Sequence, residues 1–480
     1  MKIAEISPEV APFSKTGGLG DVAGALPAHL AALGAEVLVV TPLHRSAAAF
    51  DLERLPMRLK VPIGETVLEA RVSRALLPGS QVPAYFIDHP GYFDREYLYG
   101  EPEGDYPDNA ARFAFLVRAS LELFKALGEI PDVVHVHDWQ GALAPVYLKT
   151  SASLAFPKTK SVLTIHNLSY QGLFPAEAME EAGLDRDLFN WKQLEYYGKV
   201  SYLKGGLIFA DALTTVSPTY AREIQTPELG CGFDGLLRDR EDRLTGILNG
   251  VDYRAWSPEQ DRHLPATYSP ADLKGKETCK RGLQRRFGLP ERREALLIGF
   301  IGRLVEQKGI DLLCAAAERL VGFDLQLAIL GTGDPRHEDM LTRLAAAHPK
   351  KVAVQLGFDE AVAHLIEGGA DAFLMPSKFE PCGLNQIYSL RYGTVPIVRR
   401  TGGLADTIVD ATPANARKGA ATGFVFGDYA PEALAGAVER ALKAWRDPKA
   451  WARLVQAAMK QDFSWGPSAK RYLDVFKSLR

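Results

Sequence analysis

Two segments of the sequence combine a cation with flexible glycines, which suits the binding of an anion. The first is Lys15-Thr16-Gly17-Gly18-Leu19, followed by Asp21, and the second is Arg400-Thr401-Gly402-Gly403-Leu404, followed by Asp406. Glycine lets backbone N–H groups approach an anion closely, and a helix N-terminus favours negative charge. The likeness of the two segments predicts two similar loops on two similar domains, with one ligand held in the cleft between them.

A third segment, Gly302-Arg303-Leu304-Val305-Glu306-Gln307-Lys308-Gly309, follows a strongly apolar run. It places Arg303 and Lys308 in the turn beyond a predicted strand. An arginine can bind phosphate oxygens with two parallel hydrogen bonds, and a lysine acts as a point charge. Two such cations suit a diphosphate, although charged residues in loops are usually just solvated.

Histidine and aspartate stand at the ends of two further predicted strands. His135-Val136-His137-Asp138-Trp139 closes one strand, and His166-Asn167 closes the next. Ligands of open α/β sheets bind at the carboxyl ends of the strands, so we expect Asp138 and His166 to face the same crevice. The alternation of a strand points His135 and His137 to the same side, and for His135 we expect a structural role. The spacing contains no diagnostic triad of metal ligands.

Glu380 lies in Phe379-Glu380-Pro381-Cys382-Gly383-Leu384, after another predicted strand and just before a helical pattern. The carboxylate could cap that helix or hold the hydroxyls of a sugar or ribose. Cys382 is expected to be a packing residue rather than a nucleophile, because the sequence places no identifiable base beside it.

The elements that must position these residues are short, apolar, β-branched runs with helical patterns between them. This alternation predicts parallel sheets covered on both faces, in two doubly wound α/β halves. After the first strand, for example, Leu19, Val22, Ala23, Leu26, Leu30 and Leu33 fall on one helix face. The clearest predicted strands are Lys2–Ile6, Glu36–Thr41, Val133–His137, Ser161–His166, Ala212–Val216, Leu296–Gly302, Leu325–Leu330, Val352–Leu356, Ala372–Met375 and Val395–Val398.

Length and composition agree with this organisation. The chain has 480 residues, and a single core rarely grows that large. We expect one domain over residues 1–248 and a second over 249–464, with the amphipathic segment 465–480 returning to the first. A net charge of −3 argues against broad binding to nucleic acid or an anionic membrane. Four dispersed cysteines and the lack of a long apolar run favour the reducing cytoplasm.

In their order and spacing, these motifs closely resemble the glycogen and starch synthase family over essentially the whole chain. The resemblance rests on the segments above together with His166-Asn167-Leu168-Ser169-Tyr170-Gln171-Gly172 and Leu248-Asn249-Gly250-Val251-Asp252. It implies a GT-B fold, which consists of two Rossmann-like domains with the catalytic cleft between them. It also implies retaining transfer of glucose from ADP-glucose to the non-reducing end of an α-1,4-glucan such as glycogen, without a cofactor or a required metal.

The resemblance also implies roles for individual residues. Lys15, Gly17 and Gly18 would contact the donor, and we place Asp21 and Thr401 with them among the substrate-binding residues. Arg303 and Lys308 would neutralise the departing ADP. Glu380 would bind the transferring glucose near the backbone N–H groups of Cys382, Gly383 and Leu384. Asp138 and His166 would orient the sugar, and Asn249 would line the same cleft.

The sequence departs from the pattern of related retaining transferases at one informative position. Many carry a second glutamate eight positions after the first, and here that position is Tyr388. A scheme with two carboxylates is therefore not assumed. Leu43-His44 also replaces the aromatic residue expected after Thr41-Pro42, and we assign no consequence to that change.

Three alternatives stay open at this point. The nearest is a GT-B transferase that uses UDP-glucose or another nucleotide sugar. A dehydrogenase would use Gly18-Leu19-Gly20-Asp21-Val22-Ala23 as a GxGxxA loop, but about ten residues separate this loop from its strand and Thr41 stands where a ribose-binding acid is expected. The third is an inactive glucan-binding protein, which the presence of Arg303, Lys308, Glu380 and His166 disfavours. The oligomeric state is not predicted.

Overall fold

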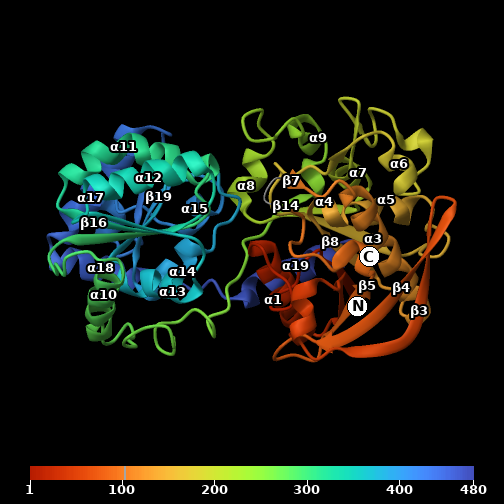
Figure 1. Cartoon of the computed structure of the whole chain (residues 1–480), viewed down its shortest axis with the longest axis horizontal. Helices are drawn as coiled ribbons and strands as arrows, with labels where there is room; N and C mark the ends of the chain where they lie inside the picture. Colours follow the sequence, from red (N-terminus) through yellow and green to blue (C-terminus); the bar gives the residue numbers. More distant parts are fainter. Residues whose placement is uncertain (102–103) are drawn as a thin grey trace. The chain divides into compact units, whose positions relative to one another are not determined.

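The computed structural model describes residues 1–101 and 104–480, which form two compact units (Figure 1). The first unit contains residues 1–216, 221–250 and 465–480. The second contains residues 217–220 and 251–464. Apart from residues 217–220, the chain leaves the first unit after Gly250 and returns to it at Trp465.

The first unit is built on a nine-stranded sheet. Its strands pair in parallel from β14 to β5, and the last two pairings are antiparallel. Neighbours along the sheet are β14 (Leu244–Gly246), β13 (Ala212–Thr215), β9 (Lys160–Ile165), β8 (Val133–His137), β1 (Lys2–Ile6), β2 (Glu36–Pro42), β5 (Pro83–Asp88), β4 (Thr66–Leu76) and β3 (Glu53–Ile63).

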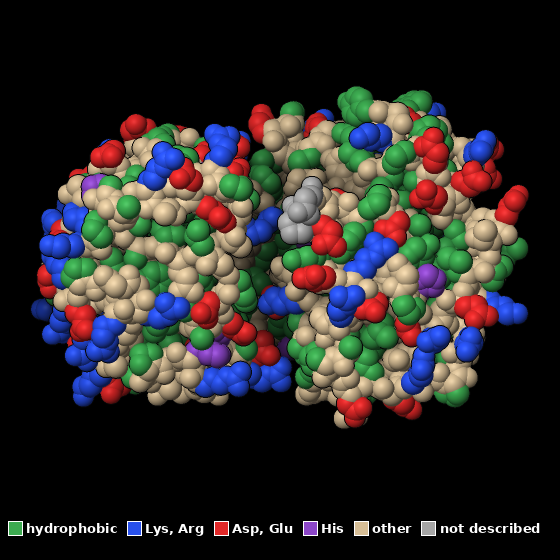
Figure 2. Space-filling view, in the orientation of Figure 1, with side chains coloured by type: hydrophobic (Ala, Val, Ile, Leu, Met, Phe, Trp, Pro, Cys, Tyr) green, Lys and Arg blue, Asp and Glu red, His purple; other side chains and the backbone are tan. Residues whose placement is uncertain are grey.

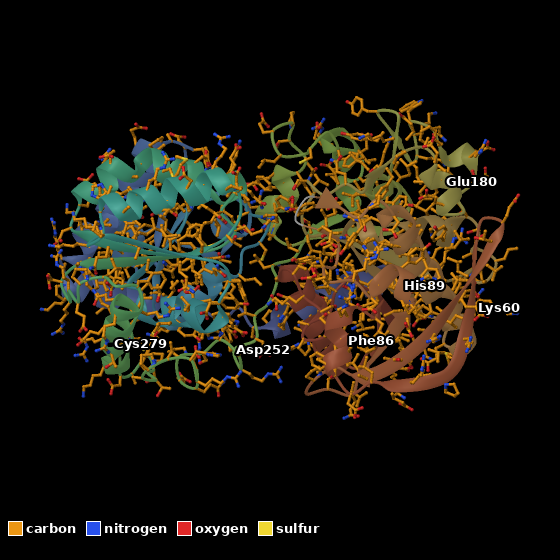
Figure 3. All side chains as sticks on the ribbon, viewed as in Figure 1. Lys60, Phe86, His89, Glu180, Asp252 and Cys279 are labelled. Carbon is orange, nitrogen blue, oxygen red and sulfur yellow. The ribbon has the colours of Figure 1, made fainter. Side chains whose placement is uncertain are left out.

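The hairpin of β3 and β4 was not predicted from the sequence. Long apolar runs mark strands buried on both faces, whereas β3 alternates apolar and polar residues and is half exposed. Figure 3 shows Lys60 on the outer edge of this hairpin, while Phe86 of β5 lies inside the unit, fully buried. Pro56 and Pro62 are tolerated in β3 because it is an edge strand.

The second unit contains a six-stranded sheet in which every pairing is parallel. In chain order of its strands the arrangement is 3-2-1-4-5-6, that of a Rossmann fold. The strands are β17 (Val352–Leu356), β16 (Leu325–Gly331), β15 (Leu296–Ile301), β18 (Ala372–Met375), β19 (Val395–Arg399) and β20 (Phe424–Phe426). The order of the strands reverses between β15 and β18, and ligands bind at such a switch point.

Helices cover both faces of the second sheet (Figure 1). Helices α11 (Ile310–Gly322) and α12 (Pro335–Ala347) lie on one face, and α10 (Lys274–Arg286), α13 (Glu360–Gly369) and α14 (Asn385–Tyr392) lie on the other. The remaining helices of this unit are α15 (Gly402–Thr407), α16 (Pro413–Arg417), α17 (Pro431–Trp445) and α18 (Pro448–Met459). Right-handed crossovers from strand to helix to strand account for this two-faced cover.

Two helices from opposite ends of the chain pack together in the first unit. Figure 1 shows α19 (Trp465–Ser478), in blue, beside α1 (Gly18–Ala32), in red. The apolar face of α1 is buried from Leu19 to Leu30, as its spacing predicted, but Leu33 lies beyond the helix end and is 44% exposed. Trp465, Ala469, Tyr472, Leu473 and Phe476 of α19 complete the same core.

The other large helix of the first unit is α3 (Asn109–Leu127), which contacts β3. Shorter helices are α2 (Pro90–Phe93), α4 (Asp138–Gly141), α5 (Leu143–Lys149), α6 (Ala178–Glu181), α7 (Tyr202–Phe209) and α9 (Asp234–Arg238), and α8 (Pro218–Glu223) has residues in both units. Two small sheets consist of β10 (Leu173–Phe174), β12 (Lys199–Ser201) and β11 (Glu195–Tyr196), and of β6 (Gly100–Glu101) and β7 (Gly104–Asp105).

The fold class expected from the sequence, α/β with two Rossmann-like doubly wound halves, is confirmed. Like the second sheet, the parallel part of the first sheet begins 3-2-1-4-5-6 in chain order, so its switch point lies between β1 and β8.

Acidic and basic side chains are interspersed over the face drawn in Figure 2. None of the helices in the described ranges is long and apolar enough to cross a bilayer.

Candidate active site

In the second unit, a lysine and a glutamate meet at the switch point of the sheet. Lys308 lies in the loop that follows β15, and Glu380 lies in the loop that follows β18. The Nζ atom of Lys308 is 2.6 Å from Oε2 of Glu380, and the hydroxyl of Ser377 donates to the same oxygen at 3.0 Å. Glu380 is only 5% exposed, so this carboxylate is held in place by charge and by hydrogen bonding.

Gly309 explains how the lysine loop comes so close to β18. Its φ is +75°, and a Cβ atom there would lie 2.2 Å from the carbonyl oxygen of Pro376. Only glycine tolerates both this backbone conformation and this approach. Arg303, in the same loop, is exposed, and its Nη2 atom lies 3.2 Å from Oε1 of Gln307. One cation of the predicted pair is therefore bound to Glu380, and the other is exposed and lies beside Gln307.

The second Thr-Gly-Gly segment packs directly against the glutamate loop. A Cβ atom on Gly402 would lie 1.9 Å from the carbonyl oxygen of Glu380, and one on Gly403 would lie 2.0 Å from that of Cys382. The backbone N–H of Gly403 also donates to the carbonyl oxygens of Glu380 and Pro381, at 3.2 and 3.1 Å. These glycines thus support the loop that carries Glu380, which is a structural reason that the sequence alone did not reveal.

The residues after Glu380 lead directly into the N-terminus of α14. Cys382 is buried at 5% exposure, in keeping with the packing role expected for it. Gly383 has φ +72°, and Leu384 is the N-cap residue of the helix. Thr401 is 1% exposed at the start of α15. The structure thereby gathers Glu380, Cys382, Gly383 and Leu384 in one loop, with Thr401 in the segment packed against it.

In the first unit, Asp138 and His166 come together as the strand-end argument predicted. Asp138 follows β8, and its Oδ1 atom accepts hydrogen bonds from the backbone N–H groups of His166 at 2.7 Å and Asn167 at 3.4 Å. Burial raises the pKa of the Asp138 carboxyl to about 7, although these two backbone donors oppose the change. Asp138 also has φ +50°, a conformation shared by only two other non-glycine residues in the described ranges. Strain of this kind is often found at functional sites.

The ring of His166 is joined to a buried cluster beneath it. The Nδ1 atom of His137 lies 3.0 Å from Nε2 of His166. On its other side, Nε2 of His137 faces the Glu5 carboxylate at 3.7 Å, and Nδ1 of His135 faces it at 3.5 Å. Glu5, His135 and His137 are close enough to share a metal ion, and a second such group consists of His263, Glu360 and His364. Sequence spacing revealed neither group.

The lysine loop of the first unit is anchored by acidic residues at its two ends. The Nζ atom of Lys15 lies 2.7 Å from Oδ1 of Asp21. Thr16 donates to Glu9 from its backbone N–H and, at 3.0 Å, from its hydroxyl. Burial raises the pKa of the Glu9 carboxyl to about 7. A Cβ atom on Gly17 would meet nothing within 4 Å, so the backbone of this loop is open to approach.

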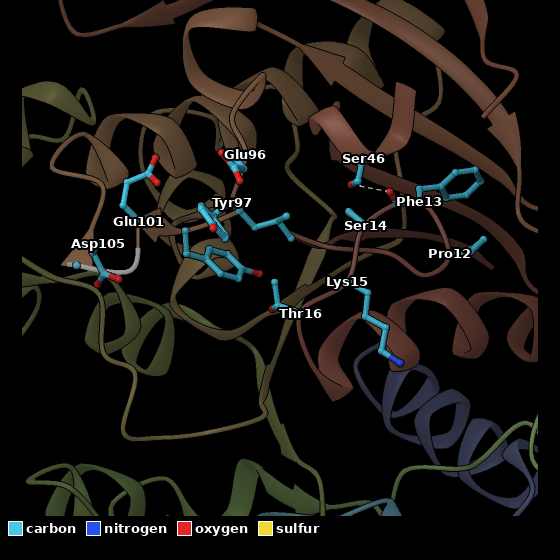
Figure 4. A pocket seen from close by; sticks show the side chains of 14 residues that line it. Pro12, Phe13, Ser14, Lys15, Thr16, Ser46, Glu96, Tyr97, Glu101 and Asp105 are labelled. Carbon is cyan, nitrogen blue, oxygen red and sulfur yellow. Dashed lines mark hydrogen bonds between the residues drawn. The ribbon is translucent and has the colours of Figure 1, made fainter. Parts of the chain in front are cut away.

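A hollow of about 670 Å³ borders this loop (Figure 4). Thr16 and Tyr97 project toward it, together with the carboxylates of Glu96, Glu101 and Asp105. The Lys15 side chain extends away from this acidic side. An exposed aromatic ring among hydrogen-bonding groups is the kind of surface that binds sugars, because the ring can pack on the apolar face of a pyranose.

Asn249 lies where the chain leaves the first unit. It is 5% exposed, and its Oδ1 atom has no hydrogen-bond partner among the described residues. Gly250 beside it permits contact with α19, because a Cβ atom there would lie 2.5 Å from Cα of Trp465. The hydroxyl of Ser468 donates to the carbonyl oxygen of Leu248 at 2.6 Å and fastens the same segment to α19.

The predicted site residues thus fall into two sets. Lys15, Gly17, Gly18, Asp21, Asp138, His166 and Asn249 belong to the first unit, and Arg303, Lys308, Glu380, Cys382, Gly383, Leu384 and Thr401 belong to the second. Sequence reasoning missed Glu5, Glu9 and Ser377. The sequence could have indicated Glu5, because it lies between apolar residues in the predicted strand Lys2–Ile6. A carboxylate buried in such a strand needs polar groups close to it.

Two Rossmann-like units, each with polar residues at the switch point of its sheet, fit the class of GT-B glycosyltransferases. Residues 2–239 match the starch synthase catalytic domain family, and residues 284–461 match the group 1 glycosyl transferases. The chain is 51% identical to a glycogen synthase of Anaeromyxobacter dehalogenans, with 100% of both chains covered. It is 48% identical to glycogen synthase 1 of Methylococcus capsulatus, with 99% of this chain and 96% of that protein covered.

Among solved structures, the chain is similar to the catalytic domain of starch synthase IV from Arabidopsis thaliana bound to ADP and acarbose. The identity is 34%, the TM-score is 0.92, and 99% of each chain is covered. A sucrose-phosphate synthase from Thermosynechococcus elongatus, 18% identical with a TM-score of 0.58, shares the fold. The chain belongs to the glycogen and starch synthase family, and it is a glycosyltransferase.

Proposed function

We propose that this enzyme transfers glucose from ADP-glucose to the non-reducing end of an α-1,4-glucan, with retention at the anomeric carbon. The observation that carries the proposal is the Lys308–Glu380 pair at the switch point of a Rossmann sheet, in a chain half identical to glycogen synthases over its full length. ADP is the leaving group of ADP-glucose, and a relative at 34% identity was solved with ADP bound.

The second unit binds and activates the donor. When the C1–O bond breaks, negative charge develops on the departing diphosphate, and Arg303 and Lys308 stabilise it. Fixed cations are effective there because they need no reorganisation as the charge forms. Arg303 is an exposed residue whose guanidinium group can bind two phosphate oxygens, while Lys308 is already oriented by Glu380. Glu380 in turn binds hydroxyls of the transferring glucose.

The first unit binds the sugar and the acceptor. Asp138 and His166 orient the transferring glucose, and Asn249 supplies a buried amide oxygen with no partner among the described residues. The backbone at Gly17, where a Cβ atom would meet nothing within 4 Å, contacts the donor together with Gly18, Lys15 and Asp21. The glucan 4-hydroxyl attacks from the face that the diphosphate leaves, and the leaving phosphate accepts its proton. Attack on the same face accounts for retention without a covalent glycosyl-enzyme.

We place this reaction in the cytoplasm. None of the four cysteines, all of which lie in the described ranges, forms a disulfide, as is usual for proteins of a reducing compartment. The donor, a nucleotide sugar, carries a diphosphate that does not cross membranes unaided, so the enzyme must meet it where nucleotides are activated.

The deciding experiment compares two donors. Purified enzyme receives glycogen with either ADP-glucose or UDP-glucose, and release of nucleoside diphosphate is measured with and without the glucan. We expect glycogen-dependent release of ADP, with release of UDP far slower. Faster release of UDP would keep the reaction class and reassign the donor to UDP-glucose, the second candidate. Folded enzyme that releases neither diphosphate would contradict the proposal.

A further inference from the structure

A carboxylate lies in the centre of the first sheet, where only apolar residues are usual. Glu5 occupies the fourth position of β1 and is 0% exposed. Its two carboxylate oxygens have no hydrogen-bond partner within normal distance among the described residues. A buried charge is costly unless other polar groups face it, so the neighbours of Glu5 must compensate for the loss of water.

Those neighbours are two histidines of the adjacent strand. Glu5 pairs with His135 in the register of β1 and β8, and the alternation of β8 brings His137 to the same side. Both imidazoles are fully buried, and each turns one nitrogen toward the carboxylate, at 3.5 Å for His135 and 3.7 Å for His137. Rings of α19 close the cluster, with Tyr472 and Phe476 centred 5.5 and 5.3 Å from His135.

A neutral histidine ring has one N–H and one lone pair, so its tautomer decides which nitrogen donates a hydrogen bond. The pKa values of His137, His166 and Glu5 determine whether this applies to the cluster. Burial lowers the pKa of His137 to about 4, with His135 contributing, and lowers the pKa of His166 well below its ordinary value. Burial by itself raises the pKa of Glu5, but the two facing histidines outweigh it and leave the pKa of this carboxyl below its ordinary value. Near neutral pH, Glu5 is therefore an anion, and His137 and His166 are neutral rings that each carry one N–H.

A neutral imidazole beside an anion has only one favourable tautomer. If Nε2 of His137 carries the proton, an N–H dipole points at the Glu5 carboxylate, whereas the other tautomer turns a lone pair toward the negative charge. At 3.7 Å the contact is longer than a hydrogen bond, so its effect is electrostatic and is strengthened by the buried surroundings. With the proton on Nε2, the Nδ1 atom of His137 can only accept.

The tautomer of His137 determines the tautomer of His166, because the rings of these two histidines are in hydrogen-bond contact. Nδ1 of His137 and Nε2 of His166 are 3.0 Å apart, so one of them must donate. Since Nδ1 of His137 accepts, Nε2 of His166 donates. A neutral His166 then has a lone pair on Nδ1, which can accept a hydrogen bond from a hydroxyl group.

We propose that Glu5 is a positioning residue that acts through His137 to fix His166 as its Nε2–H tautomer, with Nδ1 ready to accept from a hydroxyl of the sugar substrate. Only the last step rests on the proposed function, because the tautomer of His166 is a property of the free enzyme. His135 serves the same carboxylate from its Nδ1 side, and its Nε2 lies 2.6 Å from the hydroxyl oxygen of Thr164. The N–H groups on Nδ1 of His135 and Nε2 of His137 thus both point at the Glu5 carboxylate and compensate for its loss of hydration.

The test is Glu5→Gln, which keeps the shape of the side chain, removes its charge and replaces one of its two acceptor oxygens with an NH2 donor. The amide that this substitution introduces can donate to Nε2 of His137, which would then carry its proton on Nδ1 and donate to Nε2 of His166. Enzyme labelled with ¹⁵N at histidine reports each tautomer through its ring nitrogen shifts, and the His166 signals are assigned by their loss in His166→Asn. We expect Nε2–H in the wild type and Nδ1–H in Glu5→Gln.

Kinetics provide the second measurement. By analogy with buried carboxylates that orient metal-binding histidines, kcat of Glu5→Gln should fall about 10- to 100-fold. The KM for the nucleotide sugar should change less than about twofold, since the mutation removes no donor contact. Glu36→Gln, which alters an exposed carboxylate on β2, is the matched control and should behave as wild type in both measurements.

Several outcomes would overturn the inference. One is Nδ1–H on His166 in the wild-type enzyme, which can be read even if Glu5→Gln does not fold. Another is a folded Glu5→Gln enzyme with an unchanged tautomer or unchanged kcat. A stoichiometric metal ion that is present in the wild-type enzyme and lost in Glu5→Gln would also overturn it, because the cluster would then be a metal site. An enzyme with the expected tautomers but without glucosyl transfer would instead contradict the proposed function.

Discussion

The Nζ atom of Lys308 lies 2.6 Å from Oε2 of Glu380, and the two residues come from loops after adjacent strands of one sheet. Lys308 is about one quarter exposed and Glu380 is almost completely buried. Removing one partner of such a pair leaves the other charge without compensation. The pair therefore links the phosphate-binding role proposed for the lysine to the sugar-binding role proposed for the glutamate.

Lys308→Ala should strongly reduce turnover. It removes a cation that stabilises the leaving diphosphate and also frees the carboxylate of Glu380. We expect kcat to fall roughly 100- to 1,000-fold, the usual effect of losing one group that stabilises a developing charge. Lys378→Ala is the matched control, because Lys378 forms an exposed pair with Glu306 at 2.5 Å. Near-wild-type kcat in Lys308→Ala, measured by ADP release, would refute the role assigned to this lysine.

The two Thr-Gly-Gly segments should respond differently to alanine. In Gly402→Ala the new Cβ atom would overlap the carbonyl oxygen of Glu380, at a residue whose φ is +43°. We expect a loss of about 1–3 kcal/mol in stability, together with reduced kcat as the glutamate loop shifts. Gly17→Ala meets no atom within 4 Å and should leave the unfolding temperature within about 1 °C of wild type.

Thermal unfolding followed by circular dichroism, with ADP release from the same preparations, distinguishes these two variants. If Gly17 is a contact for the donor, Gly17→Ala should raise the KM for the nucleotide sugar without loss of stability. Equal destabilisation of both variants would mean that the two glycine pairs have the same structural role, contrary to the contacts described above.

The sequence predicted the strand ends well and the relations between strands poorly. Val133–His137 ends where expected because its buried valines stop at the polar pair His137-Asp138, although the strand also contains the buried His135. This pattern placed Asp138 and His166 at one sheet edge. It could not show that Glu5 pairs in register with His135, since that pairing joins residues 130 positions apart. Strand order is a long-range property that single-strand patterns do not contain.

The role of a glycine is also difficult to predict from the sequence when it depends on a distant segment of the chain. The pattern around Gly402 and Gly403 predicts a ligand loop, but the space that their side chains would occupy is filled by the backbone of residues 380–382. From sequence alone, a glycine required for ligand approach and one required for packing look identical. Likewise the hairpin of β3 and β4 escaped prediction because its half-exposed strands alternate in polarity instead of forming apolar runs.

Tyr97 offers a test of the hollow beside the Lys15 loop as a glucan surface. The ring is 43% exposed at the edge of a hollow that also contains carboxylates. Tyr97→Ala should raise the KM for glycogen roughly 3- to 10-fold, as expected for the loss of one ring stacked on a sugar. Phe358→Ala, which removes an aromatic ring that is 82% exposed in the second unit, should leave this KM unchanged. An unchanged KM in Tyr97→Ala would exclude the hollow as the acceptor surface.

Asp138 should make the stability of the first unit depend on pH. Burial raises the pKa of this carboxyl from 3.8 to about 7 in the folded protein. The folded state therefore retains a proton that the unfolded chain has already lost, and stability decreases as pH rises from about 4 to about 7, by up to roughly 1.4 kcal/mol per pH unit. Above pH 7 both states are ionised, and this contribution no longer changes.

Asp138→Asn isolates this effect, because the amide does not titrate and its oxygen can still accept from the backbone N–H of His166. The unfolding temperature of the variant, relative to wild type, should rise between pH 5 and pH 7.5. The neighbouring carboxyl of Glu9, whose pKa burial also raises to about 7, is present in both proteins and cancels to first order in the comparison. A difference between the two proteins that is constant over this range would mean that Asp138 is already ionised at pH 5 in the folded enzyme, so that its two backbone donors outweigh the cost of burial.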